Sequence, residues 1–303
     1  MIIRLLVLSI AIVVLALMVK APSTSSNVYG DIVAYRGGGQ VSLGLTVSDQ
    51  VCSSENIIES HNPYIEHTFP AIHHAINRGI VSLYLNIRRT SDNDFAVFHN
   101  ESVDCYTDGN GKVQELSLLE LQDLDAGYRY TYDNGETYPW RNQGLMIKSL
   151  REIVEVYPHQ EYWLSLDSPD FHSIESLMNY LSTLPFKSSR QLVVLSSDTA
   201  VERLQAIAPE LTSVSEGTIQ KCLTDYTLYG WSRFFPSSCK NTIVILRPES
   251  LEYLWGWPES FAARMAEHGS RVYLETKNLA FDPQYDLRES GVGIISGDLA
   301  AFK

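Results

Sequence analysis

Hydrophobic positions along this 303-residue chain gather in short runs separated by amphipathic segments. Eight runs are β-branched or continuously apolar, as is typical of parallel strands that are covered on both faces. The eight runs are Asp31–Tyr35, Val81–Ile87, Tyr162–Leu166, Leu192–Leu195, Thr212–Ser215, Thr242–Leu246, Val272–Thr276 and Gly293–Ser296. The pattern therefore predicts eight buried parallel strands.

The segments between these runs carry the signals of helices. Thr68 can cap a helix, and Ser117 and Ser149 each stand three residues before a glutamate, which is the spacing of a capping box. The segment Pro258–His268 is followed by Gly269, a suitable C-terminal cap. Alternating strands and helices imply right-handed crossovers and a parallel sheet. Eight such units predict an α/β fold, a (β/α)₈ TIM barrel.

One element breaks this alternation. The run Phe95–His99 follows Val81–Ile87 after only a short polar turn at Ser91–Asp94. A parallel crossover needs a dozen or more residues, so these two runs are expected to pair antiparallel. The sequence therefore predicts an antiparallel hairpin excursion after the second strand, which brings Asn86 close to His99.

The N-terminus has a different character. Residues 5–19 are apolar and uncharged between Arg4 and Lys20, which indicates a signal anchor or a signal peptide. As a helix they rise about 22 Å, short of the ~30 Å hydrocarbon core, and snorkelling of the two flanking cations would close the gap. No convincing small-x-small cleavage site follows, which favours the anchor, with a cleaved signal as the alternative.

This reading divides the chain into three parts. Residues 1–20 are the predicted anchor or signal, 21–30 a short tether, and 31–303 the barrel. The barrel is then expected on the exported side of a membrane, periplasmic or extracellular/lumenal, or secreted if the signal is cleaved. The net charge of −13 argues against a nucleic-acid partner, because phosphate backbones repel an acidic surface.

Four segments place polar residues at the ends of the early strands and around the hairpin. They read Ala34-Tyr35-Arg36-Gly37-Gly38, Ile65-Glu66-His67-Thr68, Leu83-Tyr84-Leu85-Asn86-Ile87 and Val97-Phe98-His99-Asn100. Their order and spacing resemble the glycerophosphodiester phosphodiesterase family, whose fold is a TIM barrel similar to that of the phosphatidylinositol-specific phospholipases C. Further similar stretches are Val103–Val113, Glu120–Gly127, Gly144–Glu152, Val272–Asn278 and Gly291–Asp298.

The resemblance implies metal-assisted hydrolysis of glycerophosphodiesters. In this family carboxylates at the strand ends hold Ca²⁺ or Mg²⁺, ions that prefer hard oxygen ligands. Two histidines act as general acid and base. Active sites of such barrels lie at the C-terminal ends of the strands.

Several residues of that chemistry are replaced in this chain. Tyr35 stands where the first family histidine belongs, and a phenol is a poor proton shuttle at neutral pH. Tyr84, Asn86 and Ser165 stand at the three carboxylate positions, so three anionic ligands have become neutral groups. The resemblance thus implies a degenerate member, with no metal ligand set and no cofactor expected.

Other charged residues remain or have been added. Arg36 and Glu66 are candidate ligand-binding residues. Arg36 is able to bind a phosphate bidentately, and a salt bridge between Arg36 and Glu66 is the alternative. His99 is either a catalytic remnant or an ordinary buried histidine. Asp167, at a family lysine position, and Glu275, at a family tryptophan position, add negative charges that are candidate ligand-binding groups.

Three readings stay open at this point. The first is a membrane-tethered, exported protein without metal-dependent hydrolysis that binds a small phosphorylated or polyol ligand. The second is an active phosphodiester hydrolase with a rebuilt site, in which Asp167, Glu275, Asn86 and His99 act and Ca²⁺ or Mg²⁺ is bound. The third is a scaffold or interaction protein whose pocket is filled by tyrosines. The sequence leaves the oligomeric state undetermined.

The four cysteines form an even set in a chain that carries an export signal, and four cysteines allow three pairings. In the barrel, Cys52 follows the first strand and Cys105 follows the hairpin, so both are expected near the same mouth. Cys222 and Cys239 flank one short segment. We predict that Cys52 lies close to Cys105 and that Cys222 pairs with Cys239.

Overall fold

A computed structural model gives the structure of the chain. It describes residues 31–39, 52, 54, 57, 62–167, 171–277, 287, 290–297 and 299. The predicted anchor and tether, residues 1–30, lie outside this described part. Among the helices that are described, none is both long enough and apolar enough to cross a membrane.

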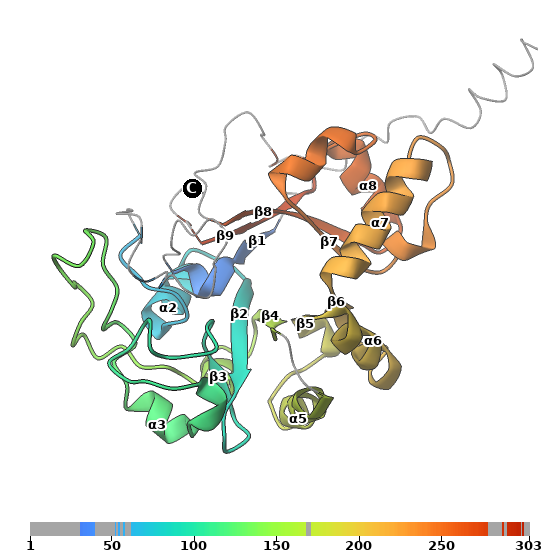
Figure 1. The fold of residues 1–303 in the computed structure, drawn as a ribbon. Coiled ribbons are helices and arrows are strands. Elements are labelled where there is room, and N and C mark those ends of the chain that lie inside the picture. The colour runs from blue at the N-terminus through green and yellow to red at the C-terminus, as the bar shows by residue number, and fades with distance from the viewer. Residues whose placement is uncertain are drawn as a thin grey trace, which may run out of the picture. The chain divides into compact units, whose positions relative to one another are not determined.

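The chain forms two compact units. Of the described residues, those within 31–215, 276–284 and 294–303 form the larger unit, and those within 216–275 and 285–293 form the smaller unit. Figure 1 shows the course of the chain and the labels of the elements.

The larger unit is built on a parallel sheet. Its strands are β1 (Ile32–Ala34), β2 (Ser82–Arg89), β4 (Glu161–Ser165), β5 (Leu192–Leu195), β6 (Thr212–Val214) and β9 (Gly293–Ser296). They follow the order β6-β5-β4-β2-β1-β9. In this register Ala34 lies opposite Leu83, and Asn86 lies opposite Ser165. The polar positions that the sequence places at the strand ends therefore come from neighbouring strands.

The strand β3 (Phe95–Val97) pairs antiparallel with the end of β2. Ile87 faces Val97, and Arg89 faces Phe95. This pairing carries β2 two residues beyond its predicted end. The turn between the two strands contains Asn93 at φ 63°, a left-handed conformation that asparagine tolerates better than most residues.

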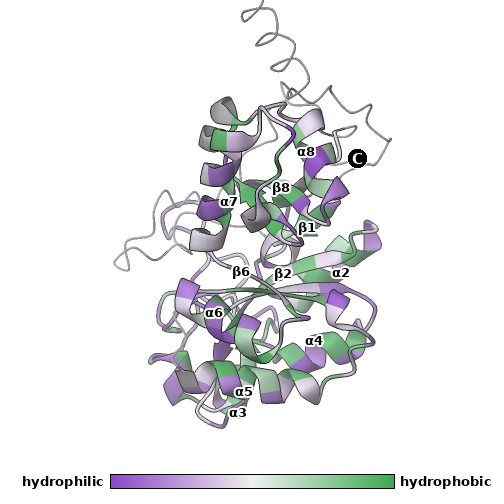
Figure 2. Ribbon diagram, turned by 90° about the vertical axis from the view of Figure 1, so that its right-hand side faces the viewer, coloured by the Kyte–Doolittle hydropathy of each residue, from purple (hydrophilic) through white to green (hydrophobic). Residues whose placement is uncertain are grey.

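In the described part of the larger unit, five α-helices connect these strands. They are α2 (Phe69–Asn77), α3 (Leu118–Gln122), α4 (Leu150–Val156), α5 (Phe171–Ser182) and α6 (Asp198–Ile207), with short 3₁₀ turns at η1 (Tyr35–Gly38), η3 (Val113–Glu115) and η4 (Ser189–Gln191). The predicted caps are confirmed: Thr68 accepts from the backbone of α2, and both capping boxes are present, at Ser117 and Ser149. Figure 2 shows hydrophobic and hydrophilic residues side by side on α4, α5 and α6, as expected of amphipathic helices.

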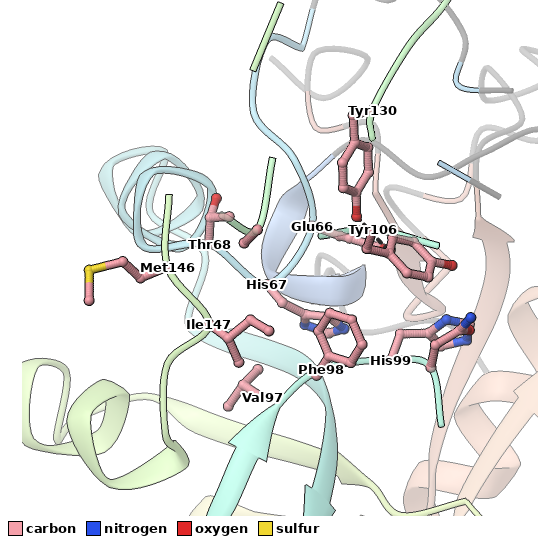
Figure 3. A pocket seen from close by; sticks show the side chains of 12 residues that line it. Glu66, His67, Thr68, Val97, Phe98, His99, Tyr106, Tyr130, Met146 and Ile147 are labelled. Atoms are coloured by element: carbon pink, nitrogen blue, oxygen red, sulfur yellow. Dashed lines mark hydrogen bonds between the residues drawn. The ribbon is translucent and has the colours of Figure 1, made fainter. Parts of the chain in front are cut away.

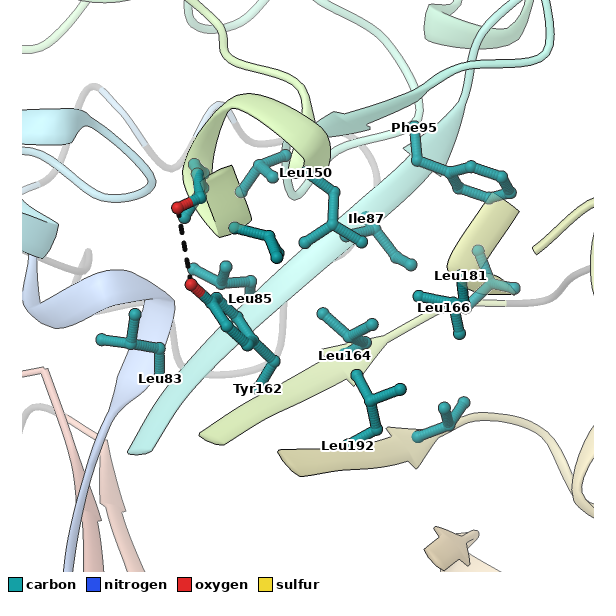
Figure 4. Close-up of a cluster of buried hydrophobic side chains, with 14 of the residues drawn as sticks. Leu83, Leu85, Ile87, Phe95, Leu150, Tyr162, Leu164, Leu166, Leu181 and Leu192 are labelled. Atoms are coloured by element: carbon teal, nitrogen blue, oxygen red, sulfur yellow. Dashed lines mark hydrogen bonds between the residues drawn. The ribbon is translucent and has the colours of Figure 1, made fainter. Parts of the chain in front are cut away.

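The main core of the larger unit lies between the sheet and these helices. Figure 4 shows side chains of β2, β4 and β5 in contact with those of α4 and α5. Leu83, Leu85 and Leu164 are completely buried. Tyr162 is also buried, and its hydroxyl donates to the backbone oxygen of Tyr157 at 2.7 Å, so its polar atom is satisfied.

The smaller unit contains two parallel strands and two α-helices in its described residues. They are α7 (Glu216–Tyr229), β7 (Ile243–Leu246), α8 (Glu259–Glu267) and β8 (Arg271–Lys277), with 3₁₀ turns at η5 (Ser237–Cys239) and η6 (Pro248–Tyr253). From Thr276 onward β8 belongs to the larger unit, where the Thr276 hydroxyl donates to the Ile295 oxygen of β9 at 3.3 Å. The parallel strands and the helices between them confirm the predicted α/β class.

Both predicted cysteine relationships are confirmed. Cys52 and Cys105 form a disulfide with their Cα atoms 5.0 Å apart. Cys222 and Cys239 form the second disulfide, with a Cα separation of 4.8 Å. The first bond lies within the larger unit and the second within the smaller unit.

Candidate functional site

The turn after β1 positions the first candidate residues. Arg36 and Gly37 adopt left-handed backbone conformations, with φ of 50° and 74°. A Cβ atom at Gly37 would lie 2.8 Å from the Ile72 side chain, so this position needs glycine. The sharp turn buries Tyr35 and Arg36 directly after the strand, and only 6% of Arg36 is exposed.

Arg36 forms a buried ion pair. Its Nη1 donates to Oε2 of Glu66 at 2.5 Å, and the Tyr130 hydroxyl donates to the other carboxylate oxygen at 3.1 Å. Although burial opposes the charge, the Glu66 carboxylate raises the pKa of Arg36 above its ordinary value. Burial and the same carboxylate raise the pKa of Tyr130. Arg36 therefore pairs with a carboxylate of the protein itself. This salt bridge is one of the two roles that the sequence leaves open for Arg36, the other being phosphate binding.

His67 lies next to this ion pair. Its backbone is left-handed, with φ of 60°, and its amide donates to the Arg36 carbonyl at 2.9 Å. The ring Nε2 lies 3.2 Å from Oδ1 of Asn86. Burial and the nearby Arg36 cation lower the pKa of His67 to about 3, so the ring is neutral at physiological pH. Since the amide oxygen accepts, Nε2 carries the proton in this arrangement.

The other replaced positions also contact neighbours. The rings of Tyr35 and Tyr84 lie 5.0 Å apart between centroids. The Ser165 hydroxyl donates to Asp167 at 3.3 Å. Arg88 Nη2 reaches the other oxygen of Asp167 at 3.2 Å. Tyr35, Tyr84, Asn86 and Ser165 thus gather at the same ends of β1, β2 and β4, as the sequence predicts.

His99 follows β3 and is only partly buried. Arg88 donates to its backbone oxygen from both Nε and Nη2, at 3.1 and 2.8 Å. The amide of Phe98 donates to the Asn86 carbonyl at 3.0 Å. The hairpin therefore brings the backbone next to His99 close to Asn86, as the sequence predicts.

Glu275 belongs to the smaller unit. Its carboxylate lies 3.8 Å from Nε of Arg247, which also donates to Glu216 at 3.1 Å. Within the smaller unit, Glu275 and Glu216 are thus the two carboxylates that lie next to Arg247.

A small cavity borders the buried ion pair in the larger unit. It has a volume of about 20 Å³ and is lined by Glu66, His67, Phe98, His99 and Tyr130, among others. Figure 3 shows His67, Phe98 and His99 around it, with the Tyr130 hydroxyl directed toward Glu66. A space of this size holds about one water molecule, whereas pockets for small-molecule ligands measure about 300–1,000 Å³.

The donor set at this site does not fit a hard divalent cation. Such ions need several anionic or carbonyl oxygens, but Tyr84, Asn86 and Ser165 offer no carboxylate. The nearest buried carboxylate, Glu66, is paired with Arg36. Among the residues that the structure describes, no group of three or more His, Cys, Asp or Glu side chains is arranged to hold a metal ion.

Two residues of this network were not assigned a role from the sequence. His67 is part of the segment Ile65-Glu66-His67-Thr68, but the sequence alone gives it no role. Tyr130 lies 64 residues from Glu66 and carries no motif. The motif itself was the available signal for His67, whereas nothing in the sequence pattern pointed to Tyr130.

Solved structures identify the class of fold. The glycerophosphoryl diester phosphodiesterase domain of an uncharacterized Mycobacterium tuberculosis protein superposes with a TM-score of 0.63 at 17% identity, covering 90% of this chain and 98% of that one. An Oleispira antarctica phosphodiesterase, solved with the product sn-glycerol-3-phosphate, gives a TM-score of 0.57 at 18% identity over 89% and 94% of the two chains. The fold is the predicted (β/α)₈ TIM barrel.

Sequence comparison then gives the family. Residues 57–182 match the Glycerophosphoryl diester phosphodiesterase family. A glycerophosphodiester phosphodiesterase of Bacillus subtilis is 25% identical over 177 residues, which cover 54% of this chain and 59% of that protein. One of Caldanaerobacter subterraneus is 29% identical over 102 residues, or 34% of this chain and 39% of that protein. The similarity to this family thus extends over residues 57–182 of the chain, and the matches with the two relatives span 59% and 39% of their own length.

Proposed function

We propose that this protein is an exported, membrane-tethered member of its family that has lost divalent-metal-dependent phosphodiester hydrolysis. The proposal rests on the residues that this chain has at the family's metal-ligand positions. Tyr84 packs against Tyr35, Asn86 is hydrogen-bonded to His67, and Ser165 is a hydroxyl. Each position is occupied by a neutral group, and each has a partner within the protein.

The size of this change is large in catalytic terms. Losing a general acid–base group removes about 10²–10⁴-fold in rate, and Tyr35 replaces one such group. Losing the cation removes the charge that stabilises the transferred phosphate, which is usually the largest single contribution. Arg36 and Glu66 are motif residues that this chain retains. Their charges compensate each other in a buried ion pair, which supports a role for both in stabilising the fold.

The remaining role in this proposal is binding rather than turnover. The partner is a small phosphorylated or polyol ligand, or a protein that uses the barrel as a scaffold. Arg88 is the candidate cation for a ligand phosphate, since its side chain is partly exposed; a phosphate would compete there with the half-exposed Asp167, which lies 3.2 Å away. Residues 5–19 supply the tether, and their apolar sequence supports an exported location.

A rebuilt hydrolase is the second candidate, favoured by the names of the relatives, which are glycerophosphodiester phosphodiesterases. In this alternative His99 and Asp167, both linked to Arg88, supply the reactive groups. The alternative requires Ca²⁺ or Mg²⁺ to be held without the three carboxylates of the family positions.

The decisive measurement is glycerophosphocholine turnover by the purified protein with added Ca²⁺ or Mg²⁺ and with EDTA. We expect no chelator-sensitive turnover above background. The matched comparison is the variant Tyr35→His/Tyr84→Glu/Asn86→Asp/Ser165→Glu, in which Ca²⁺ binding is followed by calorimetry. Chelator-sensitive turnover of the unmodified protein at about 1 s⁻¹ or more, an ordinary enzymatic rate, would contradict the proposal and establish the rebuilt hydrolase.

A further inference from the structure

The two disulfides differ in their exposure to solvent. Cys222 and Cys239 are completely buried, whereas Cys52 and Cys105 are each only partly buried. Thiol–disulfide exchange requires a thiolate to reach one of the two sulfur atoms of the bond. A reductant therefore has access to the Cys52–Cys105 bond under conditions that leave the buried disulfide of the smaller unit intact.

The exposed disulfide belongs to a set of contacts that fastens one loop of the larger unit to another. Ser54 is completely buried, and its hydroxyl donates to the carbonyl oxygen of Cys105. The amide of Thr131 donates to the Ser54 carbonyl at 3.0 Å, and the amide of Ile57 donates to the Thr131 carbonyl at 3.4 Å. The disulfide and these three hydrogen bonds thus hold the backbone at Thr131 in place.

The residue before Thr131 is the one that contacts the buried ion pair. Tyr130 is buried, and its ring lies 5.7 Å from the Tyr106 ring between centroids. Its hydroxyl donates to Glu66, which is the partner of Arg36 (Figure 3). The position of the Tyr130 side chain over the ion pair therefore depends on a stretch of backbone that the exposed disulfide region fixes.

Apolar packing links the same parts of the chain. Ile57, Tyr106 and Tyr130 belong to one cluster of buried side chains, and the partly buried Cys105 packs against it. The disulfide joins residues separated by 53 positions in the sequence. A disulfide of this kind typically shifts the equilibrium for separating the segments that it joins by about 30-fold or more. Without the bond, separation of Ile57 from this cluster becomes correspondingly more frequent.

We propose that the Cys52–Cys105 disulfide is a redox switch. Its reduction loosens the loop at Tyr130 and opens the ion pair of Arg36 and Glu66 to solvent. The reductant is a dithiol, which supplies two electrons and two protons. One of its thiolates attacks a cysteine sulfur to give a mixed disulfide, and its second thiol then releases the protein as two free thiols and leaves as a disulfide. The inference is independent of the proposed loss of hydrolysis.

The first measurement tests whether reduction is selective. The full chain is incubated with increasing concentrations of dithiothreitol under native conditions, free thiols are alkylated with iodoacetamide, and the modified residues are mapped by mass spectrometry. We expect Cys52 and Cys105 to be alkylated at concentrations that leave Cys222 and Cys239 unmodified, because only the first pair is accessible.

The second measurement tests the coupling to the ion pair. Phenylglyoxal modifies accessible guanidinium groups, and Arg36 is buried in the oxidised protein. We expect selective reduction to raise the rate of Arg36 modification by about 30-fold or more, since modification requires opening of the loop. The variant Cys52→Ala/Cys105→Ala should show the raised rate without reductant. Reoxidation of the wild type should restore the protection, so the test does not depend on the folding of the variant.

Two controls separate a local opening from unfolding of the whole chain. Arg264 is buried in the smaller unit and should keep its low rate of modification when the exposed disulfide is reduced. The matched variant Cys222→Ala/Cys239→Ala removes the buried disulfide and should leave the Arg36 rate unchanged.

Three results would overturn the proposal. Reduction of all four cysteines at the same dithiothreitol concentration would show that exposure does not distinguish the two bonds. An unchanged rate at Arg36 after selective reduction would show that the disulfide does not control access to the ion pair. Equal increases at Arg36 and Arg264 would assign the effect to global unfolding and not to a switch in the larger unit.

Discussion

Replacing His67 by asparagine should make the protein less sensitive to acid. The imidazole is buried beside the Arg36 guanidinium, and these surroundings lower its pKa to about 3 from an ordinary 6.5. The native state therefore binds fewer protons at this site than the unfolded chain does. Because the unfolded state binds more protons, stability rises with pH, and it is lost as the pH falls below about 6.5 toward 3.

The magnitude follows from this difference in pKa. One pKa unit corresponds to about 1.36 kcal/mol, so the neutral His67 lowers the free energy of unfolding by about 2 kcal/mol between pH 8 and pH 5. Asparagine has no titrating group and tolerates the left-handed backbone that His67 adopts at φ 60°. The variant should lack this part of the pH dependence.

The assay is urea unfolding at pH 8 and pH 5 with both disulfides intact, followed by circular dichroism. The quantity compared is the change in unfolding free energy between the two pH values, so that other titrating groups cancel between wild type and variant. The control is His172→Asn on α5, which removes an exposed imidazole and should keep the wild-type pH dependence. An identical loss of stability in wild type and His67→Asn would refute the argument that burial holds this imidazole neutral.

Two further predictions concern stability. Glu66→Gln should destabilise the protein by about 3–5 kcal/mol, because it leaves the buried Arg36 without a counter-charge. Adding Arg36→Met to this variant should recover much of the lost stability, as measured by urea unfolding. Cys222→Ala/Cys239→Ala opens a loop with a sequence separation of 17 and should lower the stability of the smaller unit by about 3 kcal/mol. Hydrogen exchange should then increase in α7 and not in the larger unit. An equal increase in both units would show that the two unfold together.

Local patterns were sufficient for most of the architecture. The capping boxes at Ser117 and Ser149 depend on residues three apart, and the β2–β3 pairing depends on a turn too short for a crossover. The disulfide Cys222–Cys239 closes one short segment. In each case a few neighbouring residues limit the backbone to few conformations, so the sequence alone supports the prediction.

The chemistry of the candidate site was only partly predictable. The order of the motifs showed which family positions had changed, and the replacements at Tyr35, Tyr84, Asn86 and Ser165 are visible in the sequence. Whether Arg36 would bind a ligand or pair with Glu66 stayed open, because both uses need the same side chain. The structure shows the ion pair, since the left-handed turn at Arg36 buries the guanidinium against Glu66.

Only the tertiary structure brought together the network around that pair. Tyr130 reaches Glu66 across 64 positions of sequence, and His67 reaches Asn86 across 19. Neither contact has a periodic or local signature, because each arises from the way the sheet and the loops after its strands fold over one another. The sequence alone determined the elements and the missing carboxylates, whereas burial, which sets both the ion pair and the low pKa of His67, is a property of the packed chain.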